Sequence, residues 1–196
     1  MDLQEAVDLC TRSLIETTED KLRRGSGVVP PTIWVFNPLL DRPLVGTITT
    51  RPFYRGIDAA RAIERLGAFP AAFNSPVVMV SWELADLCVA LDADDGTTPT
   101  AIITVLADMD GRHQMTALFG EFYSLNEPSS GAASAGVRWQ PEQDLGDAEL
   151  PAPIEGALAL WQREAPQSTV ESAVRVHGEL QNEGYEITLA PRKSVP

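Results

Sequence analysis

Four side chains of the sequence have the chemistry of a general acid or base and lie beside apolar segments: Glu83, Asp86, His113 and Glu121. Glu83 directly follows the most apolar run of the chain, residues 76–82. A carboxylate in that place is either exposed at the end of a strand or partly buried with a raised pKa. Paired with Asp86 or Glu121, it would supply the acid and base of a small hydrolase or isomerase. We favour the exposed strand end.

A nucleophilic site is a second hypothesis. The dipeptide Asp110-Gly111 separates two apolar segments and predicts a two-residue hairpin turn, which would place Asp108 opposite His113. Together with Cys88, these side chains would form a Cys-His-Asp triad. Cys88 belongs to an apolar segment without a glycine-rich turn, and cysteines in such segments are usually inert. We therefore expect a surface pair of Asp108 and His113 and no triad.

Motifs for metals and cofactors are missing from the sequence. The two histidines, His113 and His177, belong to unrelated segments. Residues 92–96 resemble the start of a calcium loop, but the glycine is in the fifth place and the twelfth residue is Ile103 where the loop needs glutamate. Neither G-x-x-x-x-G-K-[ST] nor G-x-G-x-x-G occurs. We therefore expect no metal and no cofactor.

The charge balance opposes a phosphate ligand. The chain carries 28 acidic and 15 basic residues, a formal net charge of −13, whereas nucleic-acid binders concentrate lysine and arginine. No run approaches the roughly 18 apolar residues that span a membrane. Residues 1–5 are acidic and polar, unlike a secretory signal, and two isolated cysteines suit a reducing compartment. We expect a cytoplasmic bacterial protein that binds neither nucleic acid nor membranes, in an oligomeric state that stays open.

The elements that must position these side chains begin with a helix. An apolar stripe predicts a helix over residues 2–24, and short strands follow over 32–36 and 44–50. A helix over 56–66 and a strand over 76–82 come next. A right-handed crossover unit of strand 44–50, this helix and strand 76–82 is one arrangement compatible with this order, and whether the two strands pair in parallel stays open.

The strongest β pattern is the hairpin over residues 100–123. Both of its faces are largely apolar, so we expect it in the centre of the sheet. The remaining pattern predicts, in order, a flexible loop at 124–136, a strand at 137–140, an acidic loop at 141–151, helices beginning at Pro153 and at a capping box on Ser168, and a strand at 185–190.

The predicted fold class is α/β or α+β. A length of 196 residues, an apolar fraction of 44% and a charged fraction of 22% are typical of one globular domain. We expect a single domain over 1–196, with a mixed sheet of about six strands, the hairpin 100–123 in its centre and about four helices packed on it.

The predicted function is that of a non-enzymatic accessory or protein-interaction module, whose partner is another protein and whose exposed binding segments lie in 124–151. The alternative is a small hydrolase or isomerase that uses Glu83, Asp86, His113 or Glu121, and a minor alternative is an acidic mimic of nucleic acid. Convergence of Glu83 and His113 in one concave pocket would favour the enzyme. Their placement on opposite faces would favour the binding module.

Overall fold

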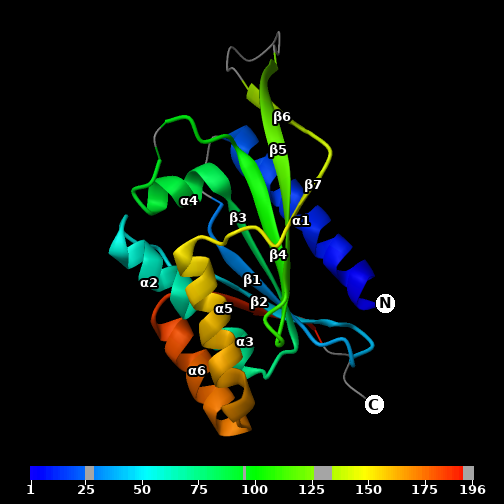
Figure 1. The fold of residues 1–196 in the computed structure, drawn as a ribbon, viewed down its shortest axis with the longest axis vertical. Helices are drawn as coiled ribbons and strands as arrows, with labels where there is room; N and C mark the ends of the chain where they lie inside the picture. The colour runs from blue at the N-terminus through cyan, green and yellow to red at the C-terminus, as the bar shows by residue number, and fades with distance from the viewer. Residues whose placement is uncertain (25–28, 95, 126–133, 192–196) are drawn as a thin grey trace.

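A computed structural model of the chain describes residues 1–24, 29–94, 96–125 and 134–191 (Figure 1). Its strands are β1 (Thr32–Phe36), β2 (Leu44–Thr49), β3 (Val77–Glu83), β4 (Ala101–Asp108), β5 (His113–Leu125), β6 (Ser134–Trp139), β7 (Gln143–Gly146) and β8 (Glu186–Leu189). Its helices are α1 (Leu3–Arg24), α2 (Ile57–Arg65), α3 (Ala68–Ala72), α4 (Leu84–Ala90), α5 (Ala152–Glu164), the 3₁₀ turn η1 (Ala165–Gln167) and α6 (Val170–Asn182).

The eight strands form one sheet in the order β6-β5-β4-β3-β1-β2-β8, with β7 paired beside β6 on the same side of β5. Every pairing is antiparallel. The long strand β5 has two partners, because β6 pairs with residues 120–125 and β7 with residues 115–117.

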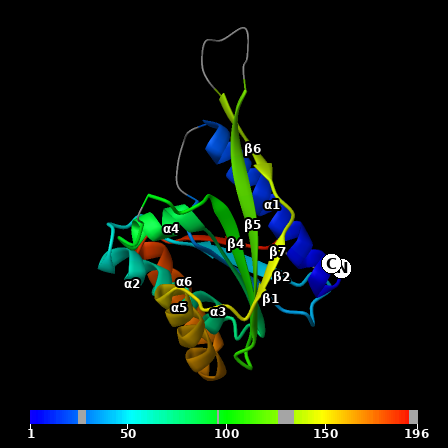
Figure 2. The ribbon, with the colours of Figure 1, turned by 45° about the horizontal axis from the view of Figure 1, so that its top comes forward.

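The sheet separates two apolar layers, because successive side chains of a strand point to opposite faces. Helices α2, α3, α5 and α6 gather on one side and α1 lies on the other, as two views of the ribbon show (Figures 1 and 2). The larger core lies under the four helices and includes Ile33, Val80 and Val105 from the strands and Ile154 and Trp161 from α5.

The face under α1 has a smaller core. Ala6 and Cys10 of the helix pack on Phe36 and Met79 of the sheet. Further along the helix, Leu14 packs with Val29 and Ile102.

A hydrogen bond joins the end of this helix to the sheet. Trp139 Nε1 of β6 donates to Glu19 Oε1 at 2.8 Å. The helix is therefore anchored on the sheet by both apolar contacts and a polar one.

The predicted α/β class is confirmed, with eight strands where about six were expected. Helix 2–24, strands 32–36 and 44–50 and helix 56–66 lie within one or two residues of their predicted bounds. The buried residues Ile154, Leu158 and Trp161 confirm the predicted apolar face of the helix that begins near Pro153.

The predicted mixed sheet is wrong, and the parallel pairing of strands 44–50 and 76–82, which the sequence left open, does not occur. β2 and β3 do run parallel to each other, but β1 lies between them and pairs antiparallel with both. Both edges of β2 are occupied, one by β1 and the other by β8, and β3 pairs with the other edge of β1.

Two short helices were not predicted. α3 and α4 have five and seven residues, too few for a periodic stripe to develop. The predicted start of the last helix at Ser168 is one residue early: Thr169 is the N-cap, and its capping box is completed by Ser172.

The two predicted loops are shorter than expected. Residues 124–125 and 134–136 of the first loop belong to β5 and β6, and its remaining residues, 126–133, lie outside the described part of the chain. The acidic loop at 141–151 contains β7. This strand pairs with the backbone of residues 115–117 of β5, whereas β6 pairs only with residues 120–125.

The hairpin over 100–123 is confirmed, but its predicted register is wrong by one residue. His113 pairs with Ala107, and the N–H of Asp108 donates to the carbonyl oxygen of Arg112. Three residues therefore form the loop. Gly111 has a φ of 84°, whereas Asp110 does not have a positive φ, so the turn is not the predicted type I′.

Candidate functional site

Glu83 is a buried structural acid, so the favoured exposed strand end is wrong. Its side chain is at the end of β3 and the residue is only 4% exposed. Glu83 Oε2 accepts a hydrogen bond from the N–H of Asp86 at 2.6 Å, and Oε1 accepts one from the N–H of Ala101 at 3.0 Å. The carboxylate thus caps the N-terminus of α4 and connects it to β4.

The environment of Glu83 opposes its ionisation. Burial raises the pKa of this carboxyl above its ordinary value, the backbone hydrogen bonds counteract the shift, and the nearby charge of Asp86 adds to it. Both carboxylate oxygens are occupied by backbone donors. The group is therefore perturbed in the manner of a catalytic acid but is directed at the protein's own backbone.

Asp86 also binds the backbone. Its Oδ2 accepts a hydrogen bond of 2.7 Å from the N–H of Val29. This bond ties the chain segment before β1 to α4. Asp86 and Glu83 are neighbours, as predicted, but both carboxylates stabilise local structure.

His113 lies on the helix-covered face of the sheet, beside α5. Its Nε2 is 3.2 Å from the carbonyl oxygen of Ala148. A carbonyl oxygen only accepts, so Nε2 carries the hydrogen in this contact. The histidine lines a cavity of about 390 Å³ together with Glu149 and Glu155.

Glu121 is exposed on β5. Its Oε1 accepts a hydrogen bond of 2.8 Å from Gln140 Nε2, and its strand partner is Arg138. It belongs to neither the Glu83 cluster nor the His113 cavity.

Asp108 is not the partner of His113. The one-residue shift of register places the two side chains on opposite faces of the sheet. Asp108 Oδ2 instead accepts a hydrogen bond of 2.8 Å from Arg112 Nε. The expected surface pair is wrong, and the Cys-His-Asp hypothesis fails with it.

The sheet register separates Glu83 from His113. His113 pairs with Ala107, which pairs with Val78, five residues before Glu83 on β3. At roughly 3.4 Å per residue the two positions are about 17 Å apart along the strand. The two side chains also lie on opposite faces of the sheet. Val78, Ala107 and His113 share one face because they are directly paired across three strands, and Glu83, an odd number of residues from Val78, lies on the other face. The predicted acids and the histidine do not meet in one pocket.

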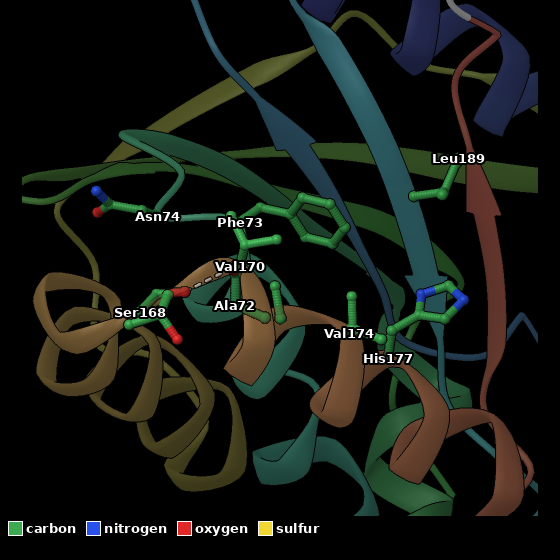
Figure 3. Close-up of a pocket in the computed structure, with 10 residues that line it drawn as sticks. Ala72, Phe73, Asn74, Ser168, Val170, Val174, His177 and Leu189 are labelled. Atoms are coloured by element: carbon green, nitrogen blue, oxygen red, sulfur yellow. Dashed lines mark hydrogen bonds between the residues drawn. The ribbon is translucent and has the colours of Figure 1, made fainter.

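A different concave surface lies between α3, α6 and β8 (Figure 3). It is an open groove with a cavity volume of about 650 Å³. The side chains of Phe73, Val174 and Leu189 point toward the same space from the end of α3, from α6 and from β8. We call this feature the α6–β8 groove.

The apolar side chains of the α6–β8 groove are unusually open to solvent. Val170, Val174 and Leu189 are 84%, 70% and 50% exposed. Val170, Val174 and His177 are spaced i, i+4 and i+7, so they form one stripe along α6. A second stripe of the same helix, with Val176 and Leu180, packs on the main core.

The position of this groove is set by how α6 begins. The Ser168 hydroxyl donates to the carbonyl oxygen of Ala72 at 2.6 Å, which holds the start of α6 against the end of α3. The Thr169 side chain accepts a hydrogen bond from the N–H of Ser172 and caps the helix. The exposed stripe therefore starts from a firmly held helix end.

Sequence reasoning missed this groove. His177, which the sequence places in a segment unrelated to that of His113, lines this groove. The sequence contained a signal for it. In helix 170–182, Val170 and Val174 face a different side from Val176 and Leu180, so the apolar surface of the helix is wider than one buried stripe requires.

The described residues contain neither a metal-binding cluster nor a membrane-spanning helix. No group of three or more histidine, cysteine, aspartate or glutamate side chains is arranged to hold a metal ion in this part of the chain. None of the described helices combines the length and the hydrophobicity needed to cross a bilayer.

The fold and the groove define the chain as an α/β protein with an eight-stranded antiparallel sheet and an open apolar groove at one edge. No protein-family model, no curated protein and no solved structure matches the chain.

Proposed function

We propose that this protein is a protein-interaction module that binds a partner protein through the α6–β8 groove. The observation that carries the proposal is the stripe of Val170 and Val174, 84% and 70% exposed, on the wall of a concave surface. Burial of a valine side chain stabilises by about 1.5 kcal/mol or more. A partner that covers the stripe would gain this free energy, and exposed apolar patches commonly mark such sites.

The state of the acidic residues supports a binding role over an enzymatic one. The carboxylates of Glu83 and Asp86 accept backbone hydrogen bonds, and His113 lies on the other face of the sheet. A general acid or base must reach a substrate proton, and these carboxylates are engaged elsewhere.

The acidic loop is a weaker candidate for the contact than the groove. Part of it forms β7 and pairs with β5, and Ala148 contacts His113. We place the interaction in the cytoplasm, because Cys10 and Cys88 are both free cysteines.

The test is site-specific photo-crosslinking in a native cell lysate. A photoreactive residue replaces Val174 in one protein and Ile57 in the control. Ile57 is a matched control because it is also 70% exposed and β-branched, and it begins α2, away from the groove. We expect a discrete cross-linked protein from position 174 and none from position 57.

A second arm uses competition. Excess unlabelled protein should suppress the cross-link, and excess Val170→Asp/Val174→Asp protein should not. Equal capture at positions 174 and 57, or equal competition by both proteins, would show that the groove is not a binding site.

A further inference from the structure

Two buried polar side chains of the sheet have no hydrogen-bond partner among the described residues. Trp82 on β3 is 1% exposed, and Thr50, directly after β2, is 6% exposed. Neither the indole Nε1 of Trp82 nor the hydroxyl Oγ1 of Thr50 lies within hydrogen-bond distance of a polar atom in this part of the chain. The large majority of buried polar side-chain atoms in proteins are hydrogen-bonded, so these two groups require an explanation.

The sheet register places both groups in one row. The N–H of Thr50 donates to the carbonyl oxygen of Pro31 at 3.1 Å, which continues the pairing of β2 with β1 by one residue. The register of β1 with β3, continued by one residue, places Pro31 opposite Trp82. Residues opposite each other in a sheet have their side chains on the same face. Thr50 and Trp82 therefore flank Pro31 on one face, with Cα atoms about 10 Å apart, which is two strand spacings.

The shared face is the one that the helices cover. Ile48 and Val80, which precede Thr50 and Trp82 by two residues, both belong to the larger core. Side chains two residues apart in a strand point to the same face. The hydroxyl and the indole are therefore directed into the core between the sheet and the helices, away from bulk solvent.

Helix α2 covers this row with small side chains. Tyr185 extends the row, because the register of β8 with β2, continued by one residue, places it opposite Thr50. Its hydroxyl donates to the carbonyl oxygen of Ala62 on α2 at 3.0 Å. The buried residues of α2 include Ala59 and Ala62, which carry only a methyl group. A buried water needs a space of about 10–15 Å³ and two to four polar partners, and this row supplies two such partners.

We propose that one buried water molecule is bound between Thr50 and Trp82 and joins β2 to β3 across Pro31. The indole Nε1 only donates, so the water accepts a hydrogen bond from it. The Thr50 hydroxyl also accepts, so the water donates to its oxygen. Globular proteins hold about one buried water for every 27 residues, so a chain of 196 residues is large enough for such a site.

The first test is NMR of the full chain, in which nuclear Overhauser effects are measured between water and the assigned indole N–H groups. Trp161 is the matched control, because it is 0% exposed but its Nε1 donates to the carbonyl oxygen of Ser75 at 3.0 Å. We expect a cross-peak with water for Trp82, with the sign of a water bound for longer than the tumbling time of the protein, and none for Trp161. A missing cross-peak at Trp82 would overturn the proposal.

The second test is ¹⁷O relaxation dispersion, which detects long-lived water itself and is not affected by hydroxyl hydrogens. Thr50→Val is compared with Thr18→Val. Thr18 is 0% exposed like Thr50, but its hydroxyl donates to the carbonyl oxygen of Leu14 at 2.8 Å. We expect Thr50→Val to lose about one long-lived water and the Trp82 cross-peak, and Thr18→Val to keep both.

Contrary results are informative in different ways. If Thr50→Val keeps the Trp82 cross-peak, Thr50 does not hold the water and the shared site is wrong. If Thr50→Val loses the cross-peak but the ¹⁷O dispersion is unchanged, the Thr50 hydroxyl hydrogen relays the signal and a direct contact replaces the proposed water. If Thr50→Val does not fold, Trp82→Phe takes its place in the dispersion experiment, because it removes the donor. An unchanged dispersion in that variant would again overturn the proposal.

Discussion

Glu83 Oε2 accepts a 2.6 Å hydrogen bond from the N–H of Asp86, so this buried carboxylate caps the N-terminus of α4. Its other oxygen accepts from the N–H of Ala101 and holds the first residue of β4. Three elements, β3, α4 and β4, therefore meet at one side chain. This arrangement makes Glu83 a stabilising residue whose effect can be measured without an assay of function.

Replacement of Glu83 tests this role. Glu83→Ala removes the cap of α4 and leaves the buried N–H of Ala101 without its acceptor, which should lower the free energy of unfolding by about 2–4 kcal/mol. Glu83→Gln keeps one acceptor oxygen and should have a smaller effect. The control is Glu121→Ala, an exposed acid on β5, which should change stability by less than about 0.5 kcal/mol. Denaturant unfolding measures all three, and equal effects of Glu83→Ala and Glu121→Ala would contradict the structural role.

The raised pKa of Glu83 predicts the sign of a pH dependence. Above the ordinary carboxyl value of 4.5 and up to the raised value, the folded protein holds more protons at this site than the unfolded chain. By linkage, the stability that Glu83 contributes is fully present below 4.5 and falls as the pH rises through this window.

The measurement is the difference in unfolding free energy between the unsubstituted protein and Glu83→Gln. This difference should be largest at acidic pH and should decrease toward neutral pH. A difference that grows as the pH rises would mean that the pKa is lowered in the fold, against the effect of burial.

Gly67→Ala should destabilise the protein although the backbone conformation allows alanine. Gly67 has φ −60° and ψ −20° between α2 and α3, but an added Cβ would overlap the carbonyl oxygen of Ala157 on α5. Because the backbone of α5 must move, we expect a loss of about 3 kcal/mol in thermal or denaturant unfolding.

The matched control for this substitution is Gly178→Ala. Gly178 lies within α6, and an added Cβ there meets no atom within 4 Å. This change should stabilise by about 0.5–1 kcal/mol, since alanine is the better helix former. A lower unfolding free energy for Gly67→Ala and a higher one for Gly178→Ala would establish the close approach of α5 to Gly67. A stabilised Gly67→Ala protein would disprove it.

Gly111→Val should destabilise the hairpin of β4 and β5 by about 1–2 kcal/mol. The φ of Gly111 is 84°, a region that β-branched residues avoid, and an added Cβ meets no atom within 4 Å. The loss is therefore conformational. Gly111→Asn should be milder because asparagine tolerates this region, and equal losses for both variants would point to a steric cause.

The sequence alone determined the local elements of this protein. The apolar stripe of α1, the buried run of β3 and the Ile154–Trp161 face of α5 were predictable, because helix and strand periodicities depend on neighbours a few residues apart. The sequence also showed that Asp110-Gly111 ends one strand and precedes another. Both a two-residue and a three-residue loop accept this dipeptide, so the register stayed undetermined.

The tertiary structure decided the order of the strands. It also decided which candidate side chains are buried and on which face of the sheet they lie. Glu83 is buried because β4 supplies the N–H of Ala101, a residue eighteen positions away. His113 and Asp108 lie on opposite faces because of one residue of register. The exposed stripe of Val170 and Val174 exists because α6 packs through Val176 and Leu180 instead. A helix with two apolar stripes does not reveal which one it will bury, since that choice depends on the packing of α3 and of the sheet on which it rests.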